Sequence, residues 1–307
     1  MKCVKTQDAV GHVLCHDITQ IIKDVKKGTA FRKGHIVTEE DIPVLLSLGK
    51  DNLYIWEKKE GILHENEAAE YLRDICINEN MSQSEVKEGK IEIIAEIDGL
   101  LKINVESLRA VNSLGEMMIA TRHTNTTVKK GDKLAGTRII PLLIEQEKME
   151  KAKEVAGNSP ILSLMPFKKK KVGIVTTGNE VFYGRIKDTF GPVVAEKVKE
   201  FGAEVIGQTI VNDDMEKIAK ATESFIEQGA DMVLCTGGMS VDPDDKTPGA
   251  IKSTGARIVS YGAPVLPGAM MLLAYYKKDE KEIPIVGLPG CVMYSKRTVF
   301  DLVLPRL

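Results

Sequence analysis

A group of acidic residues directly follows a glycine pair in the last third of the chain. The apolar run Met232–Cys235 stops at Thr236-Gly237-Gly238-Met239-Ser240, and the acidic turn Asp242-Pro243-Asp244-Asp245 comes next. Glycines let backbone N–H groups approach a ligand closely. Carboxylates hold Mg²⁺ in proteins, usually together with substrate phosphates. The segment therefore predicts a loop that binds a phosphorylated ligand and Mg²⁺, although a tight turn beside a solvated acidic loop explains the same residues.

The residues after the acidic turn predict a helix that supports the same chemistry. Thr247 and Pro248 are residue types preferred at an N-cap and at a first helical position. The positive end of such a helix would face the glycine loop, where it favours a bound anion. Loop amides and a helix dipole are thus expected at one site.

The surrounding segments predict a sheet that positions this loop. From Lys171 onward, short apolar strands alternate with amphipathic helices, which is typical of a parallel sheet covered on both faces. Ligands in such sheets bind beyond the carboxyl ends of the strands. The loops 177–180, 236–245 and 288–290 each follow an apolar strand, so we expect them to converge on one crevice. Strands are expected at 172–176, 204–210, 232–235, 257–259 and 283–287, and helices at 192–201, 215–228 and 291–303.

Two smaller modules are expected ahead of this domain. Residues 1–80 predict a mixed α/β module, and residues 81–160 a β-rich module that ends in a charged linker helix. The molecule is therefore expected to be an α/β protein whose C-terminal three-layer α/β/α domain, residues 165–307, carries a mostly parallel sheet. The first two modules contain no catalytic constellation, so a scaffold, dimerisation or substrate-wall role is expected for them.

Composition and charge exclude several classes of protein. The chain has 307 residues and a formal net charge of −2, so it lacks the basic excess of a general nucleic-acid binder. No apolar run approaches the ~18 residues that span a bilayer, and the start of the chain lacks the layout of a signal peptide. The five cysteines form no CxxC pair, and all five histidines precede residue 124, which argues against a zinc site and a disulfide framework. We therefore expect a cytoplasmic protein that binds neither nucleic acid nor membrane.

Four motifs together resemble the molybdopterin-binding domain. Molybdopterin adenylyltransferases, molybdopterin molybdenumtransferases and the competence/damage-inducible nucleotide-processing proteins share this domain. The segment Asp8–Leu14 is also similar to the opening of the molybdenumtransferases. The motifs, which fall within residues 170–307, are Thr177-Gly178-Asn179-Glu180, Thr236-Gly237-Gly238-Met239-Ser240 through Asp245, Pro267-Gly268 and Leu288-Pro289-Gly290.

The resemblance implies roles for particular residues. In the family, the Gly-Gly loop and the Thr-Gly-x-Glu loop embrace the pterin and its phosphate, and an acid at the position of Asp245 supports Mg²⁺ and turnover of the adenylated cofactor. Asp245 and Glu180 are therefore expected to be catalytic, with Asp245 also a metal ligand, although a helix-entry acid would explain Glu180 as well. The residues expected to bind the cofactor are Thr177, Gly178, Asp188, Thr236, Gly237, Gly238, Met239, Ser240, Pro289 and Gly290.

Three departures from the family pattern bear on the reaction. Thr189-Phe190 follows Asp188 where the family has Ser-Asn. Ala269-Met270 stands where molybdenumtransferases have Lys-Pro, which removes a cation that could hold molybdate, and Cys291-Val292 replaces their Asn-Pro. Pterin or phosphate binding tolerates these changes better than molybdate insertion does.

The leading hypothesis is a molybdopterin-binding protein of molybdenum-cofactor assembly. If it is an enzyme, the expected chemistry is Mg²⁺-assisted adenylyl transfer, or release of AMP coupled to molybdate insertion. Its ligands would be molybdopterin or the adenylated form, with ATP or AMP and molybdate. A non-catalytic carrier or sensor of the cofactor is the first alternative, and a pyrophosphatase acting on dinucleotides is the second. The resemblance also suggests self-association as a dimer or trimer.

Overall fold

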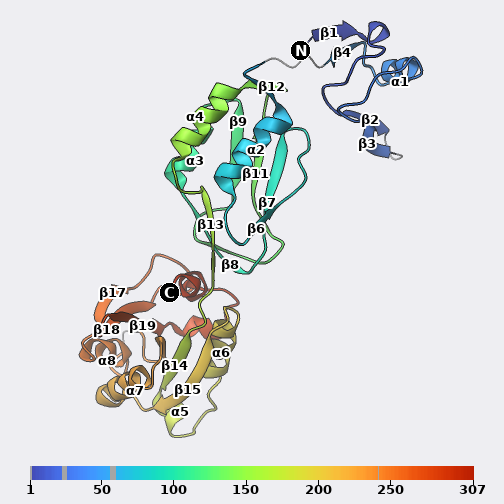
Figure 1. Ribbon diagram of the computed structural model, residues 1–307. Helices are drawn as coiled ribbons and strands as arrows, with labels where there is room; N and C mark the ends of the chain where they lie inside the picture. The colour runs from blue at the N-terminus through green and yellow to red at the C-terminus, as the bar shows by residue number, and fades with distance from the viewer. Residues whose placement is uncertain (1, 23–25, 56–59, 241) are drawn as a thin grey trace. The chain divides into compact units, whose positions relative to one another are not determined.

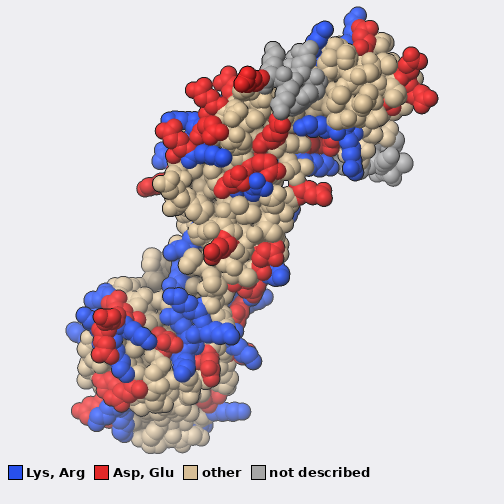
Figure 2. All heavy atoms as spheres, viewed as in Figure 1, with Lys and Arg blue, Asp and Glu red and all other residues tan. Residues whose placement is uncertain are grey.

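The computed structural model describes residues 2–22, 26–55, 60–240 and 242–307 (Figure 1). The chain forms two compact units, residues 1–165 and 166–307. Acidic and basic side chains are interspersed over the face seen in Figure 2, in keeping with the small net charge. Within the described residues, none of the helices has the length and apolar character required to cross a membrane.

The first unit begins with a small module around its own core. Strand β1 (Lys2–Lys5) pairs antiparallel with β4 (Asn52–Ile55), and β2 (Ile18–Ile22) forms a hairpin with β3 (Lys26–Phe31). The short helices are η1 (Thr6–Asp8) and α1 (Asp41–Ser47). The buried apolar side chains of this core are Ala9, Leu14, Ile18, Val37, Leu45 and Leu53.

A four-stranded antiparallel sheet dominates the rest of the first unit. Its strands, in spatial order, are β6 (Met81–Gln83), β7 (Lys90–Ala95), β11 (Lys133–Ile139) and β9 (Met117–Thr121). The helices α2 (Glu65–Cys76), α3 (Val105–Asn112) and α4 (Gln146–Ala156) share one core with this sheet. Helix α2 therefore packs with strands that follow it, whereas the boundary expected at residue 80 assigned it to the preceding module. The remaining strands are β5 (Ile62–His64), β8 (Gly99–Ile103), β10 (Thr126–Val128), β12 (Leu143–Glu145) and β13 (Leu162–Pro166).

The second unit is a six-stranded sheet with helices on both faces, as the sequence predicts. The spatial order is β15 (Glu204–Val211), β14 (Lys171–Thr177), β16 (Met232–Thr236), β19 (Lys281–Leu288), β18 (Leu272–Lys278) and β17 (Arg257–Tyr261). The first four strands are parallel, and β18 is antiparallel to both of its neighbours. The mostly parallel α/β architecture is therefore confirmed.

Alternate residues of the central strands enter two different cores. On one face, Val175 and Val233 pack with residues of α7 (Met215–Glu227) and α8 (Thr247–Ser253). On the other face, Ile174 and Leu234 pack with residues of α6 (Phe190–Lys199) and α9 (Val299–Val303). Since successive side chains of a strand point to opposite faces, a strand buried on both sides becomes a continuous apolar run. Figure 1 shows α7 and α8 on one side of the sheet and α6 on the other.

Two features of the second unit differ from the sequence-based prediction. The single helix expected at 291–303 is wrong: a 3₁₀ turn, η2 (Gly290–Met293), is followed by irregular chain and then by α9. Thr298 and Asp301 form a capping box that starts the helix anew, with the Thr298 N–H donating to Asp301 Oδ2 at 2.7 Å. Strand β18 was not predicted. The other elements of this unit are α5 (Asn179–Phe182) and η3 (Leu304–Arg306).

Candidate functional site

The three loops expected to converge do leave the sheet side by side. In the register of the sheet, Thr176 lies opposite Thr236, and Thr236 lies opposite Leu288. Strand β15 ends at Val211, opposite Thr177, so its following loop starts at the same edge. Because all four strands are parallel, their carboxyl ends form one rim, which is where α/β sheets bind ligands. The candidate site is this rim.

The two glycines of the central loop occupy positions that only glycine fits. Gly237 and Gly238 have φ angles of +85° and +56°, in the left-handed region. A Cβ at Gly237 would collide with the carbonyl oxygen of Thr177 and lie 2.8 Å from its hydroxyl. A Cβ at Gly238 would lie 2.9 Å from the Thr247 hydroxyl. The loop backbone therefore packs closely on β14 and α8, against the Thr177 carbonyl and the hydroxyls of Thr177 and Thr247.

Thr247 fixes the glycine loop from the helix side. Its buried hydroxyl donates to the Gly237 carbonyl at 2.8 Å and lies 3.3 Å from the Thr177 hydroxyl, while its N–H donates to the Gly238 carbonyl at 3.2 Å. The expectation that Thr247 is the N-cap was wrong by one residue, since Lys246 takes that position and α8 starts at Thr247. The helix has seven residues. Thr247 thus positions the loop through hydrogen bonds to the loop itself.

Tyr261, which no motif in the sequence singles out, holds the next part of the loop. Its hydroxyl lies 3.0 Å from the Met239 carbonyl and 3.4 Å from the Ser240 carbonyl, to either of which it can donate. The Met239 side chain is buried in the core, so this residue can meet a ligand only through its backbone, whereas Ser240 is exposed. Val241 lies outside the described residues. The loop is therefore tied to β14, α8 and β17 at three separate points.

One hydroxyl at the start of the loop has no partner. Thr236 is fully buried, and its Oγ1 makes no hydrogen bond within the described part of the chain. Buried polar atoms are nearly always satisfied by protein, water or ligand. The hydroxyl is thus a free donor or acceptor at the base of the predicted binding loop.

Acidic side chains from three segments lie around the rim, and one of them is the half-buried Asp213. Burial raises the pKa of Asp213, the hydrogen bond from the Asn179 N–H at 2.9 Å opposes this rise, and the negative charges of Glu180, Asp244 and Asp245 raise the pKa further. Charges on two other loops therefore act on the Asp213 carboxyl group. Asp213 is therefore a candidate residue of the site, and it is not among the site residues predicted from the sequence.

The neighbouring Asp214 is the actual cap. Its Oδ1 accepts hydrogen bonds from the N–H groups of Glu216 at 3.0 Å and Lys217 at 3.2 Å, and it is the N-cap of α7. Asp213 and Asp214 are adjacent and identical in type, so the sequence cannot tell which one caps the helix. The contact of Asp213 with the N–H of Asn179, 34 residues earlier, distinguishes it from Asp214. Asp213 was therefore missed for lack of any local signal.

The acids fit a metal that arrives with a phosphorylated ligand better than a preformed metal cage. Asp245 is half-buried, and its Oδ2 accepts the Asp242 N–H at 3.0 Å, which leaves its other oxygen available. Within the ranges that the structure describes, no group of three or more Asp, Glu, His or Cys residues is arranged to hold a metal ion alone. Mg²⁺ is commonly bound by one or two carboxylates together with phosphate oxygens. Asp245 and Asp213 are suited to that kind of partial site.

The remaining residues expected at the site lie at different depths of the rim. Thr177, Gly178 and Pro289 are buried, while Glu180 and Gly290 are exposed. Asp188 is already occupied: its Oδ1 accepts the N–H groups of Phe190 at 2.9 Å and Gly191 at 3.2 Å, and its Oδ2 accepts Gln208 Nε2 at 2.5 Å. Asp188 therefore caps the start of α6, whatever contact it makes with a ligand.

The second unit matches a known protein family. Residues 173–307 match the model of a probable molybdopterin binding domain. The second unit belongs to the molybdopterin-binding domain family. This agrees with the resemblance carried by the loop motifs. Residues 3–57 match a domain of unknown function, so the two matches leave residues 58–172 uncovered.

Individual relatives match only part of the chain. A molybdopterin molybdenumtransferase of Synechococcus elongatus is 28% identical over 163 residues, which is 50% of this chain and 38% of that protein. A CinA-like protein of Mycobacterium tuberculosis is 38% identical over 77 residues, 25% of this chain and 18% of that protein. The chain thus spans well under half the length of these curated relatives. The MoaB structure of Thermus thermophilus, a molybdopterin biosynthesis enzyme, is 24% identical and covers 45% of this chain and 91% of its own, with a TM-score of 0.39.

Proposed function

We propose that this protein binds molybdopterin or its nucleotide form at the rim of the second unit and acts in molybdenum-cofactor biosynthesis. The observation that carries the proposal is the glycine loop, which two positive-φ glycines and Thr247 hold against β14 beside the partly buried Asp213. Backbone N–H groups of such a loop are suited to a phosphate. The family of the second unit supports the pterin as the remainder of the ligand.

The chemistry proposed for this site is adenylyl transfer to molybdopterin, or release of AMP from adenylated molybdopterin coupled to molybdate insertion. In the adenylyl transfer, a phosphate oxygen of the pterin forms a bond to the α-phosphorus of ATP, and the bond from that phosphorus to the pyrophosphate oxygen breaks. Mg²⁺, when bound, would neutralise charge on the phosphates. Asp245 and Asp213 would hold it, and the loop amides at Gly237 and Gly238 would stabilise the charge that develops on the transferred phosphoryl group. Glu180 would add a further carboxylate at the rim.

The departures from the molybdenumtransferase pattern favour nucleotide and pterin binding over molybdate insertion. Ala269 and Met270 supply no cation for molybdate, and Cys291 replaces an amide side chain. If these substitutions abolish turnover altogether, the protein is a non-catalytic carrier of the cofactor. Asp245 and Glu180 favour an enzyme instead, because a carrier does not require them.

A direct assay separates these forms. The full chain would be incubated with molybdopterin, ATP and Mg²⁺ while pyrophosphate is measured, and with adenylated molybdopterin, Mg²⁺ and molybdate while AMP is measured. Asp245→Asn should abolish the release in either assay, whereas Asp242→Asn, a change of an exposed acid in the same loop, should leave it intact. Tight pterin binding without any release would establish the carrier. If the protein binds no pterin, the proposal is wrong.

A dinucleotide pyrophosphatase is a second candidate, favoured by the 38% identity to the CinA-like protein. This activity needs no pterin. Incubation with ADP-ribose and a divalent metal would then yield AMP and ribose 5-phosphate, because water attacks one phosphorus and the bridging P–O bond breaks. Cleavage of ADP-ribose together with a lack of affinity for molybdopterin would decide for this candidate.

A further inference from the structure

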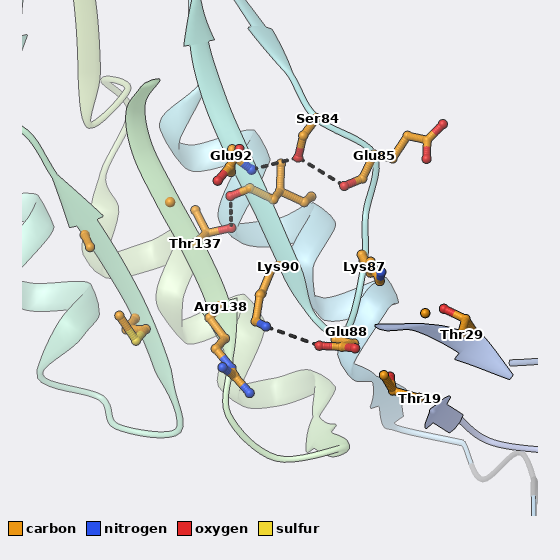
Figure 3. A pocket seen from close by; sticks show the side chains of 15 residues that line it. Thr19, Thr29, Ser84, Glu85, Lys87, Glu88, Lys90, Glu92, Thr137 and Arg138 are labelled. Atoms are coloured by element: carbon orange, nitrogen blue, oxygen red, sulfur yellow. Dashed lines mark hydrogen bonds and ion pairs between the residues drawn. The ribbon is translucent and has the colours of Figure 1, made fainter. Parts of the chain in front are cut away.

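The outward face of the sheet in the first unit carries a pocket of its own. It has a volume of about 750 Å³, within the usual range of roughly 300–1,000 Å³ for small-molecule sites. Strands β7, β11 and β9 form its floor, and the segment Ser84–Glu88 forms one wall (Figure 3). Thr19, Gly28 and Thr29 of the β2–β3 hairpin also line the pocket, and Figure 3 shows Thr19 and Thr29 near Glu88. Neither family match covers residues 84–138.

Small residues at the centre of the pocket floor leave space above the sheet. Gly136 lies between Glu92 of β7 and Ala120 of β9 in the sheet register. Gly136 has no positive φ, and a Cβ there would meet no atom of the described residues within 4 Å. Glycine in a strand interior is destabilising relative to alanine. Neither packing nor backbone geometry requires glycine at this position, whereas the close approach of a ligand would require it.

The next row of the floor is cationic. Arg138 lies directly opposite Lys90 on one side and Met118 on the other. Like charges at directly opposed positions of a sheet are destabilising. Lys90 pairs with Glu88 at 3.2 Å, and the pocket carboxylate Glu92 pairs with Lys133 at 2.6 Å. Two like charges, those of Lys90 on β7 and Arg138 on β11, thus face each other in the pocket.

Arg138 is the cation of this row without a direct partner. Among the described residues its guanidinium makes no hydrogen bond or ion pair, and it lies within the field of the half-buried Glu65. Lys87 also lines the pocket, as does the exposed acid Glu85. Figure 3 shows Arg138 and Lys90 side by side on the lower part of the floor, with Glu88 at the far end of Lys90. A bound anion beside Arg138 would relieve the repulsion between the two cations.

We propose that this pocket binds a small molecule with one anionic group, a phosphate or a carboxylate, and a flat apolar body. The anion pairs with the Arg138 guanidinium, which can bind either group through two N–H donors. The apolar body lies over Gly136 and Ala120 against Met118, whose side chain is 42% exposed. This site is independent of the function proposed for the second unit.

The test uses two probes that share one ring system and differ in the anion. Binding of 1-naphthyl phosphate and of 1-naphthoate to the full chain would be measured by titration calorimetry. Arg138→Gln should weaken binding about tenfold or more, since hydrogen bonds to charged groups contribute roughly 1.5–3 kcal/mol. Arg109→Gln, which removes an exposed arginine of α3 outside the pocket lining, should have no effect.

A size series at Gly136 tests the location. Gly136→Phe should abolish binding because the ring fills the open space above the strand, whereas Gly136→Ala should retain most of it. Circular dichroism of both variants checks that the fold is kept. A Cβ at position 136 meets no described atom within 4 Å, and the ring in Gly136→Phe would extend into the pocket. A preference for one probe identifies the anion as phosphate or carboxylate. Failure of both probes to bind at millimolar concentration, or binding that ignores Arg138→Gln and Gly136→Phe, would overturn the proposal.

Discussion

The packing of the glycine loop on β14 can be tested with two alanine substitutions. Gly237 and Gly229 have nearly identical φ angles of +85° and +86°. An alanine therefore suffers the same left-handed backbone penalty at either position, about 1–2 kcal/mol. The surroundings differ: a Cβ at Gly237 would collide with the Thr177 carbonyl oxygen, whereas a Cβ at Gly229, at the end of α7, would meet none of the described atoms within 4 Å.

The difference between the two variants isolates the steric contact. Gly229→Ala should destabilise the second unit by about 1 kcal/mol, because the reduced entropy of the unfolded chain offsets part of the backbone strain. Gly237→Ala should cost about 1–3 kcal/mol more, the usual range for an overpacked site. Its carbonyl neighbour belongs to the last residue of a buried strand and cannot move without disturbing the sheet.

Hydrogen exchange of peptides that cover β14 and β16 measures both effects in the full chain. It reports the opening free energy of the second unit, so the first unit does not contribute. Pterin titration of the same samples should show lost affinity for Gly237→Ala and unchanged affinity for Gly229→Ala. Equal destabilisation by the two variants, with equal affinity, would refute the close packing of the loop on Thr177.

Three further predictions concern the residues around the loop. Thr247→Val removes the donor to the Gly237 carbonyl and should destabilise the second unit by about 1–3 kcal/mol, the cost of a buried group left unpaired; urea unfolding followed by hydrogen exchange measures it. The pKa of Asp213 is raised in the folded protein, so folding favours its protonated form. The resulting stabilisation is complete at a pH below the pKa of Asp213 in the unfolded chain, and it is lost as the pH rises through the pKa of Asp213 in the folded protein. Asp213→Asn should therefore be more stable than wild type at neutral pH and should lack this part of the pH dependence, which thermal unfolding from pH 3.5 to pH 7 would reveal in a ~0.1 M salt buffer. Asp188→Ala should cost about 0.5–2 kcal/mol through the lost cap of α6; pterin affinity that survives this change would limit Asp188 to a structural role.

The sequence could predict the position of the loops that directly follow the strands. The apolar runs before Thr177, Thr236 and Leu288 are readable because each strand is buried on both faces. Once the strands are known to be parallel, their carboxyl ends must share one edge. The glycines of the central loop are equally readable, since few other residues adopt positive φ.

Contacts between distant residues decided what the sequence could not predict. Tyr261 reaches the loop across 22 residues, and Asp213 is fixed by an amide 34 residues away. Strand β18 was missed although its apolar and aromatic residues, Leu272 to Tyr276, favour a strand ahead of the turn that leads into β19. The break in the last predicted helix was different in kind, because the capping pair Thr298 and Asp301 is visible in the sequence itself.

The contacts that hold the glycine loop also link ligand binding to the stability of the second unit. Thr177, Thr247 and Tyr261 come from three different elements, and each bonds to or packs on the same short backbone segment. A loop held at three points presents its amides without ordering them on binding, which lowers the entropic cost of capturing a phosphate. The carboxylates act in the opposite sense, since their mutual repulsion is relieved when a proton or a metal cation neutralises part of their charge. The rim thus combines a firmly held glycine loop with an excess of negative charge, and the proposed ligand, which carries phosphate together with a divalent cation, would satisfy both at once.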